Sequence, residues 1–466
     1  MLAGRVKDVP HYLVLDQGSH ASKAMIFDAQ GGVTASAEVA VATHRSGSDR
    51  VEHDADEIVA SLQQAIREAH RASGLGAVRL AGAGLATQRS SVVCWDGADG
   101  TALSPVLSWQ DRRNAEGLAA LALDDARVGE ISGLVVSPHY GASKLRWCLA
   151  ELPAVRRALS AGRLQCGPLA SFVLHRLLEE RPSLVDPANA GRTLLWDLAE
   201  RDWSDELLAA FDIPRACLPR CVPNRHAFGT LRVGELEAPL CVATGDQPAA
   251  VFAWGQPSAD TLFVNIGTGA FVQRLFDGAV PVVPGLLRGI AWEDETRSFG
   301  VLEGTVNGAG AALDWLAAER GVKVDMLLEN APRWLREVKD PPRFSNGVGG
   351  LGSPYWDASY PVGFSERASL AAETVAVLES IVSLLQANIE AMVGAVTEAP
   401  PPTRIIISGG LARLDGLCER LAERSGLAVE RPAAFEATAH GLAWLLHPGS
   451  DRNKSLNKNK KPSKNG

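Results

Sequence analysis

The sequence has few cysteines, and they are not spaced as a metal site or a disulfide framework requires. None forms a Cys-x-x-Cys pair; the seven cysteines stand at positions 94, 148, 166, 217, 221, 241 and 418. Cys217 and Cys221 lie four positions apart, but Pro219 separates them and no second cysteine pair is near. Buried or surface thiols are the simpler interpretation, and we expect no zinc site.

The sequence also lacks a long apolar run and a secretory leader. A membrane-spanning helix needs about 18 or more consecutive apolar residues, and no uninterrupted run reaches that length. Arg5, Lys7 and Asp8 precede the first predicted strand, so the N-terminal segment has no apolar signal-peptide core. These features predict a cytoplasmic protein that does not bind a membrane.

Positive charge is scarce outside the C-terminal segment. The net charge is −8, although residues 449–466 carry six basic residues against one acidic residue, so the rest of the chain is more acidic still. Binding along a nucleic acid needs a basic stripe, so we expect no nucleic-acid partner. The segment 449–466 has almost nothing apolar to bury, and its composition predicts a disordered basic tail.

The tail composition leads to a first testable prediction. Removing residues 449–466 should leave the melting temperature and the turnover unchanged, because this segment has one apolar side chain, Leu456. Thermal unfolding and activity of the truncated chain provide the measurement. A drop of several degrees in melting temperature would show that the tail docks.

Length and periodicity predict two α/β domains. At 466 residues the chain exceeds the size at which one core stops growing. Three meandering strands are predicted first, then a helix that opens at Asp54. This order is typical of a ribonuclease-H-like half, whereas the alternative, an ordinary doubly wound sheet, would place a helix directly after the first strand. The predicted strands are 12–16, 24–28, 33–41, 78–86, 91–95, 261–266, 271–276 and 404–408, and the later helices are 307–318, 371–396 and 414–425.

Three glycine turns follow apolar strands and bracket an acid–amide pair. The turns are Asp16-Gln17-Gly18-Ser19, Gly267-Thr268-Gly269 and Gly409-Gly410, and the pair is Asp246-Gln247. The first two turns, with little side-chain bulk and several free N–H groups, suit phosphate oxygens, and Gly409-Gly410 would let an adenine or ribose approach the backbone closely. A plain tight turn is the alternative for each. A carboxylate between two such turns fits the base for a hydroxyl that attacks a nucleotide's terminal phosphate. We therefore predict a small-molecule kinase with Asp246 as its base.

Other side chains have both functional and structural interpretations. Asp16 fits a Mg²⁺-bound water, since Mg²⁺ needs only one or two carboxylates, and Lys23 fits a phosphate. Arg89 and Trp109 suit an arginine and aromatic wall for a polyhydroxy ligand. The alternative for Trp109-Gln110-Asp111-Arg112-Arg113 is a surface ion-pair cluster, and a lone histidine such as His139 is more often structural.

Taken together, these motifs resemble the FGGY family of carbohydrate kinases over nearly the whole body, from Tyr12 to about Leu446. The resemblance is carried by the three glycine turns, Gly245-Asp246-Gln247, Thr87-Gln88-Arg89, the Trp109 motif, Asp186-Pro187-Ala188-Asn189, Leu302-Glu303-Gly304, Ser353-Pro354-Tyr355-Trp356 and Glu436-Ala437-Thr438-Ala439. It implies two ribonuclease-H-like lobes of the actin-like ATPase type around a central nucleotide cleft. It also implies ATP and Mg²⁺ as cofactors and a small-molecule sugar or polyol as the partner, with homo-oligomerisation left open.

The resemblance also implies a role for each candidate residue and a division of the chain. Asp246 is the base, Asp16 the metal-side carboxylate, and 1–247, 248–448 and 449–466 are the acceptor-binding lobe, the nucleotide-binding lobe and the tail. The residues expected to face ATP are Ser19, His20, Lys23, Gly267, Thr268, Gly269, Gly310, Asp314, Gly409 and Gly410. The residues expected to face the acceptor are Arg89, Trp109, His139, Asp246, Gln247 and Phe271.

The chain is most similar to the glycerol kinases of this family but departs from them near the acceptor. Ser90 stands where these kinases place a glutamate, and His139 where they place a tyrosine; His20, Leu414 and Asp415 are further departures. The rival hypothesis is an actin-like ATP-binding switch without phosphotransfer, which would not need a base beside an acceptor pocket. A dinucleotide oxidoreductase is excluded because no GxGxxG follows the first strand.

Overall fold

The computed structural model describes residues 10–47, 49–394, 396, 399–432 and 436–447. The described chain divides into two compact units. Unit 1 comprises the described residues up to Pro257, Ile290–Ser298, and the described residues from Glu436 onward, and unit 2 comprises Ser258–Gly289 and the described residues from Phe299 onward that precede Glu436. This division differs from the predicted boundary after residue 247, since the last described helix belongs to unit 1. The predicted tail, 449–466, lies outside the described residues.

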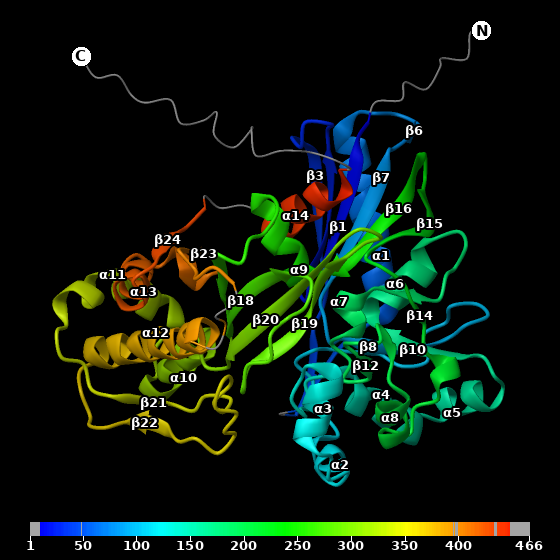
Figure 1. Ribbon diagram of the computed structural model, residues 1–466. Coiled ribbons are helices and arrows are strands. Elements are labelled where there is room, and N and C mark those ends of the chain that lie inside the picture. Colours follow the sequence, from blue (N-terminus) through cyan, green and yellow to red (C-terminus); the bar gives the residue numbers. More distant parts are fainter. Residues whose placement is uncertain (1–9, 48, 395, 397–398, 433–435, 448–466) are drawn as a thin grey trace, which may run out of the picture. The chain divides into compact units, whose positions relative to one another are not determined.

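The main sheet of unit 1 has the strand order β15-β16-β7-β1-β2-β3, and β6 also pairs with β16 (Figure 1). Strands β1, β7 and β16 are parallel neighbours, whereas β2 and β3 continue from β1 as an antiparallel meander. The strand bounds are β1 Tyr12–Gln17, β2 Ala21–Phe27, β3 Val33–Ala40, β6 Val78–Arg79, β7 Gly82–Thr87, β15 Arg225–Val233 and β16 Leu236–Gly245. The predicted meander is confirmed, and the predicted strand 78–86 is divided into β6 and β7.

A second sheet of unit 1 has the order β10-β8-β9-β5-β4. Its strands are β4 His44–Ser46, β5 Arg50–His53, β8 Val92–Asp96, β9 Val106–Leu107 and β10 Leu164–Pro168; the short pairs are β11 Leu184–Val185 with β14 Arg220–Cys221 and β12 Trp196–Asp197 with β13 Asp202–Trp203. The helices are α1 Ala55–Ser73, α2 Ala115–Ala119, α3 Asp125–Ser132, α4 Gly141–Glu151, α5 Pro153–Ser160, α6 Leu169–Leu177, α7 Pro187–Ala190, α8 Asp205–Ala210, α9 Asp246–Ala250 and α14 Ala437–Leu446.

Helix α1 shows how the local sequence produces an element of this unit. The Asp54 carboxylate accepts hydrogen bonds from the backbone N–H groups of Asp56 and Glu57, which begins the helix, and Gly74 ends it with a left-handed φ of 67°. Ile58, Leu62 and Ile66 recur at four-residue spacing and are fully buried, so this face packs on β2 and β3. The predicted start of this helix at Asp54 is confirmed.

Unit 2 is built on a sheet with the order β19-β20-β18-β17-β23-β24 (Figure 1). Its strands are β17 Thr261–Ile266, β18 Ala270–Asp277, β19 Leu287–Glu293, β20 Ser298–Val306, β23 Arg404–Ser408 and β24 Ala428–Glu430, and β21 Phe344–Asn346 pairs separately with β22 Val362–Phe364. The residues of β19 from Ile290 onward are counted in unit 1. The helices are α10 Gly310–Arg320, α11 Val324–Glu337, α12 Leu370–Gly394 and α13 Leu417–Ser425. The predicted helices began three residues too early at α10 and α13.

Helix α12 is long and apolar enough to cross a membrane by length and composition. Its side chains Leu378, Ile381 and Leu385 are fully buried in the core of unit 2, together with residues of β17, β18 and β23. Burial inside a protein core accounts for this apolar composition.

Candidate functional site

The candidate residues of unit 1 meet at one edge of the main sheet. Because β1, β7 and β16 are parallel and adjacent, their C-terminal ends lie side by side, with Gln17, Thr87 and Gly245 in one register row. The residues that follow these strands carry the polar side chains predicted from the sequence. Loops at the carboxyl ends of parallel strands are the usual place for a ligand site in an open α/β sheet.

Asp246 stands at this edge, where β16 passes into α9. Its carboxylate Oδ1 accepts a hydrogen bond from the backbone N–H of Gln247 at 2.8 Å, and its backbone carbonyl accepts one from Thr438 Oγ1 at 3.3 Å. Burial raises the pKa of Asp246 above the ordinary aspartate value, while the positive charge of Arg89 acts in the opposite direction. An oriented carboxylate with a raised pKa has the properties of a general base.

Arg89 lies beside Asp246 and is held in place by two features of the β16 end. Its Nη2 donates to Gln247 Oε1 at 2.6 Å. A Cβ atom at Gly245 would lie 2.4 Å from Arg89 Cδ, so only glycine lets the arginine side chain cross the backbone here. Arg89 and Gln247, both predicted to face the acceptor, are thus brought together.

Trp109 joins the β1 turn to the loop after β9. Its indole Nε1 donates to Ser19 Oγ at 3.0 Å, and its backbone N–H donates to Ser91 Oγ at 2.9 Å. The His139 ring packs edge-on near the Trp109 ring, with centroids 5.8 Å apart. Burial, followed by the charges of Arg112 and Lys144, holds the pKa of His139 well below its usual range, so the imidazole is neutral. An aromatic wall with a neutral histidine therefore adjoins the β1 turn.

Asp16 and Lys23 have separate environments on the neighbouring strands β1 and β2. Burial and then the charge of Asp246 raise the pKa of Asp16 to about 7, while Lys23 lowers it. Lys23 Nζ is ion-paired with Glu436 at 2.8 Å and with Glu38 at 3.3 Å, so its charge is shared with two carboxylates. His20 is exposed.

Asp16 and Asp246 stand at the same edge of the sheet, at the ends of β1 and β16, which flank β7. After burial, the charge of Asp246 contributes to the raised pKa of Asp16. Within the described ranges, no group of three or more His, Cys, Asp or Glu side chains is placed to hold a metal. Mg²⁺ keeps several of its waters and is usually bound by one or two carboxylates plus phosphate oxygens, so the small donor set suits it.

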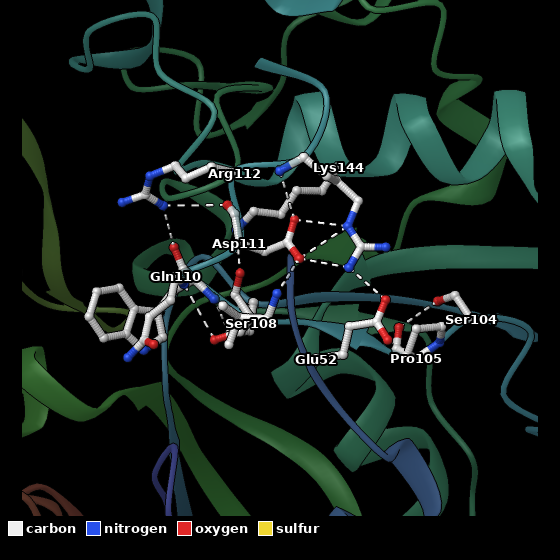
Figure 2. Close-up of polar contacts among 12 residues, drawn as sticks. Glu52, Ser104, Pro105, Ser108, Gln110, Asp111, Arg112 and Lys144 are labelled. Carbon is white, nitrogen blue, oxygen red and sulfur yellow. Dashed lines mark hydrogen bonds and ion pairs between the residues drawn. The ribbon is translucent and has the colours of Figure 1, made fainter. Parts of the chain in front are cut away.

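The alternative interpretation of this motif as a surface ion-pair cluster is right about the pairing of Asp111 with Arg113 but wrong about its location. Asp111 and Arg113 are 0% and 2% exposed, and Arg113 Nη2 lies 2.7 Å from Asp111 Oδ2. Glu52 approaches the same guanidinium group at 2.6 Å, and the Val51 N–H donates to Asp111 at 2.8 Å (Figure 2). The pair is internal because the loop after β9 folds back onto β5. Arg112 turns away and donates to the Trp109 carbonyl at 2.9 Å.

Most of the predicted nucleotide residues of unit 2 gather at one edge of its own sheet. The parallel strands β17 and β23 end together, with Asn265 opposite Ser408, so the 267–269 turn and Gly409 lie side by side. The backbone N–H of Gly310 donates to the Gly267 carbonyl at 2.9 Å, which fixes the start of α10 against that turn. A Cβ at Gly409 would meet the Ile266 carbonyl oxygen at 2.4 Å, so glycine permits this close approach.

Of two further predicted residues of unit 2, one lies in a strand beside this edge and the other is exposed on a helix. Phe271 lies in β18, paired in register with Asn265 and Thr305. Asp314 is exposed on α10. Thr268 and Gly410 are exposed at the gathered turns.

The structure gives supporting roles to residues for which the sequence predicted no role. Gln88 and Ser91 hydrogen-bond to each other at 3.0 Å and hold Ser19 and Trp109. No role was predicted for Lys144 from the sequence, although a lysine at an inward position of an amphipathic helix indicates a buried charge with specific partners. The role of Glu436 had no local signal, because its partner Lys23 is more than four hundred positions earlier.

Two family models and several curated and solved relatives match this chain. The N-terminal domain model of the FGGY family of carbohydrate kinases matches residues 11–253, and the C-terminal domain model of that family matches residues 262–446. The chain is 35% identical over 457 residues to the glycerol kinase of Thermus brockianus, covering 94% of this chain and 90% of that protein. It is 32% identical over 450 residues to glycerol kinase 1 of Pseudomonas aeruginosa, covering 93% and 89%.

Solved structures give the same fold. Plasmodium falciparum glycerol kinase with ADP matches with a TM-score of 0.83 at 20% identity, covering 94% of this chain and 89% of that chain. A xylulose kinase from Rhodospirillum rubrum matches with a TM-score of 0.79 at 20% identity, covering 93% and 89%. The predicted pair of actin-like ATPase lobes is confirmed. Because the two domain models together span most of its length, this chain belongs to the FGGY family of carbohydrate kinases.

Proposed function

We propose that this carbohydrate kinase transfers the terminal phosphoryl group of ATP to a hydroxyl of a small sugar or polyol, with Asp246 as the general base. Unit 1 binds the acceptor and unit 2 binds the nucleotide. The observation that carries this proposal is the half-buried Asp246 carboxylate at the end of β16, oriented by the Gln247 N–H at 2.8 Å and placed beside Arg89. Glycerol and xylulose kinases among the relatives support polyols and ketoses as acceptors.

The chemistry needs one proton acceptor and little covalent participation by the protein. The acceptor hydroxyl gives its proton to the Asp246 carboxylate as its oxygen forms a bond to the terminal phosphorus of ATP. The bond from that phosphorus to the bridging oxygen breaks, and ADP leaves. Positioning and charge stabilisation supply most of the catalysis in such transfers. The raised pKa of Asp246 makes its carboxylate a stronger base than an ordinary aspartate.

The side chains around Asp246 have separate roles in binding the acceptor. Arg89 and Gln247, joined at 2.6 Å, present donors to the hydroxyl that reacts. Trp109 supplies a flat apolar wall. His139, which is neutral, can both donate and accept a hydrogen bond at the far end of the acceptor.

The nucleotide side depends on backbone groups more than on charge. The turn 267–269 and Gly409-Gly410 bring exposed, small residues to one sheet edge, where N–H groups suit phosphate oxygens. In unit 1, Ser19, His20 and Lys23 are proposed to contact phosphate. Asp16 would hold Mg²⁺ near Asp246, and the ion would neutralise charge on the phosphates.

Helix α12 and the acidic composition support a cytoplasmic location for this enzyme. The most apolar long helix in the described chain contributes its side chains to a protein core. We therefore place the enzyme in the cytoplasm, with no membrane partner.

The Arg89 contact leads to a prediction about Gly245. In Gly245→Ala, the added methyl group would lie 2.4 Å from Arg89 Cδ, so the arginine must leave Gln247. Loss of a hydrogen bond to a charged group costs about 1.5–3 kcal/mol, so kcat/KM for the acceptor should fall roughly 10- to 150-fold. The KM for ATP should be unchanged. Gly363→Ala, where a Cβ meets nothing within 4 Å, is the control and should behave as the parent. An unchanged acceptor kcat/KM in Gly245→Ala would remove Arg89 from the acceptor site.

A direct test of the function uses the full chain with magnesium ATP and a panel of polyols and ketoses. Release of ADP is measured with and without each acceptor. We expect release that depends on at least one acceptor and a phosphorylated product in equal amount. Nucleotide binding without acceptor-dependent release would instead support the ATP-binding switch.

A further inference from the structure

Lys144 is a fully buried lysine whose ammonium group contacts backbone carbonyls only. Its side chain is 0% exposed, and Nζ donates to the carbonyl oxygens of Ser90 at 3.0 Å, Ser108 at 2.7 Å and His139 at 2.8 Å. A lysine ammonium group has three hydrogens, so these three bonds use all of them. A neutral amine has only two, and a methylene chain has none.

The three carbonyls belong to three segments that each carry a candidate acceptor residue. Ser90 directly follows Arg89, Ser108 directly precedes Trp109, and the third carbonyl is that of His139 itself. These segments come from the end of β7, the end of β9 and the loop before α4. The first two segments are also joined by the Trp109 N–H, which donates to Ser91 Oγ at 2.9 Å, and the ammonium group ties the His139 segment to both of them.

Helix α4 gives Lys144 a fixed base. A Cβ at Gly141, in the first turn of this helix, would lie 2.8 Å from Val92 Cγ1, so the helix packs directly on β8. The Ala142 N–H also donates to the Thr193 carbonyl at 2.7 Å. Because α4 is packed this closely, it can fix the positions of the loops that Lys144 binds.

The three carbonyl oxygens, more than the surrounding charges, make a buried ammonium group tolerable. Burial and then the charge of Arg112 hold the pKa of Lys144 well below the usual lysine value, while the charge of Asp111 acts in the opposite direction. Figure 2 shows Lys144 and Arg112 near the cluster formed by Asp111 and Glu52. The buried Asp111 is paired with Arg113, which also contacts Glu52 at 2.6 Å. Two carboxylates thus face three cations, Arg112, Arg113 and Lys144, so the carbonyl oxygens are the main partners of the Lys144 ammonium group. An uncompensated buried charge would be far more costly.

We propose that Lys144 is a positioning residue for the acceptor, which holds Arg89, Trp109 and His139 in one arrangement through their backbones. This inference rests on the proposed function of the site. Lys144 does not contact the acceptor itself. Its loss therefore changes the geometry of the acceptor wall while leaving the nucleotide residues of unit 2 as they are.

Unit 2 contains a matched control. Arg274 is also 0% exposed and donates to three backbone carbonyls, those of Ala259 at 2.9 Å, Met392 at 2.9 Å and Pro400 at 2.6 Å. None of these carbonyls adjoins a candidate site residue. Arg274→Met therefore removes a comparable buried tether with no role at the acceptor.

The experiment compares Lys144→Met, Lys144→Gln and Arg274→Met with the parent, in the full chain. We expect kcat/KM for the acceptor to fall about 100-fold in Lys144→Met, since a misplacement of about 1 Å can have this effect, with an unchanged KM for ATP. Lys144→Gln, which keeps two N–H groups, should show a smaller loss. Arg274→Met should lower the melting temperature and leave the acceptor kcat/KM of the folded protein unchanged.

Two outcomes would overturn the inference. Equal melting losses in both methionine variants, with no change in acceptor kcat/KM, would make Lys144 a purely structural residue. A parallel rise in the KM for ATP would indicate general distortion. If Lys144→Met does not fold, Lys144→Gln carries the same comparison. A parent chain without acceptor-dependent ADP release would contradict the proposed function itself, which separates that failure from this one.

Discussion

Asp246→Asn is expected to lose phosphoryl transfer by about 10²- to 10⁴-fold while it keeps its nucleotide affinity, because a positioned base contributes that much to the rate. The amide is nearly isosteric with the carboxylate and can still accept the Gln247 N–H bond, so the turn between β16 and α9 should survive. Single-turnover kinetics with a saturating acceptor measure the chemical step, and the melting temperature checks the fold.

A second aspartate serves as the control for this substitution. Asp54 caps α1 through hydrogen bonds to the Asp56 and Glu57 N–H groups, and asparagine caps a helix equally well. Asp54→Asn should therefore match the parent in rate and in melting temperature. If Asp246→Asn turns over within a few-fold of the parent, another group takes the proton.

Because the pKa of Asp246 is raised, we also expect a characteristic pH dependence of the acceptor kcat/KM. A base must be deprotonated to accept a proton, so acceptor kcat/KM should fall as the pH drops through the raised pKa of Asp246. The fall should therefore begin at a higher pH than an ordinary aspartate would give. In Asp246→Asn, the residual rate should lack this dependence.

Glycerol is expected not to be the best acceptor, although glycerol kinases are among the relatives. The family resemblance places a glutamate at the position of Ser90, and a carboxylate there would accept charge-assisted hydrogen bonds from a small triol. Without this carboxylate, about 1.5–3 kcal/mol of transition-state stabilisation is lost for glycerol, which lowers its kcat/KM roughly 10- to 150-fold. A four- or five-carbon polyol or a ketose can use the space and reach His139. The ratio of kcat/KM values across an acceptor panel is the measurement.

A pair of substitutions at Ser90 isolates the charge from the shape. Ser90 is buried and has a left-handed φ of 63°, and its carbonyl is held by Lys144, so its side chain is presented from a fixed backbone. Ser90→Glu should raise the preference for glycerol, whereas Ser90→Gln, of the same shape without the charge, should raise it less. If the parent has a higher kcat/KM for glycerol than for every longer polyol and ketose, Ser90 and His139 do not select a longer acceptor.

The local features of this protein were readable from its sequence. The β1–β3 meander, the Asp54 cap of α1 and the strand before Gly267 follow from side-chain period and turn chemistry, which act between residues a few positions apart. The candidate site was predictable to the same extent, because glycine turns and the Asp246-Gln247 pair follow strands directly. Parallel pairing of β1, β7 and β16 then brings such strand ends to one edge.

The tertiary structure decided which side chains support those motifs and from which segments. The sequence was equally consistent with a surface position for Asp111 and Arg113. The packing of their loop on β5 buries them. Lys23 pairs with Glu436, and the last described helix joins unit 1, through contacts between distant segments. The role of Lys144 also depends on the tertiary structure, because its ammonium group donates to three carbonyls that come from three separate segments. Every residue has the same backbone carbonyl group, so the sequence does not indicate which carbonyls will need a side-chain donor. Folding decides this when it brings the carbonyls together.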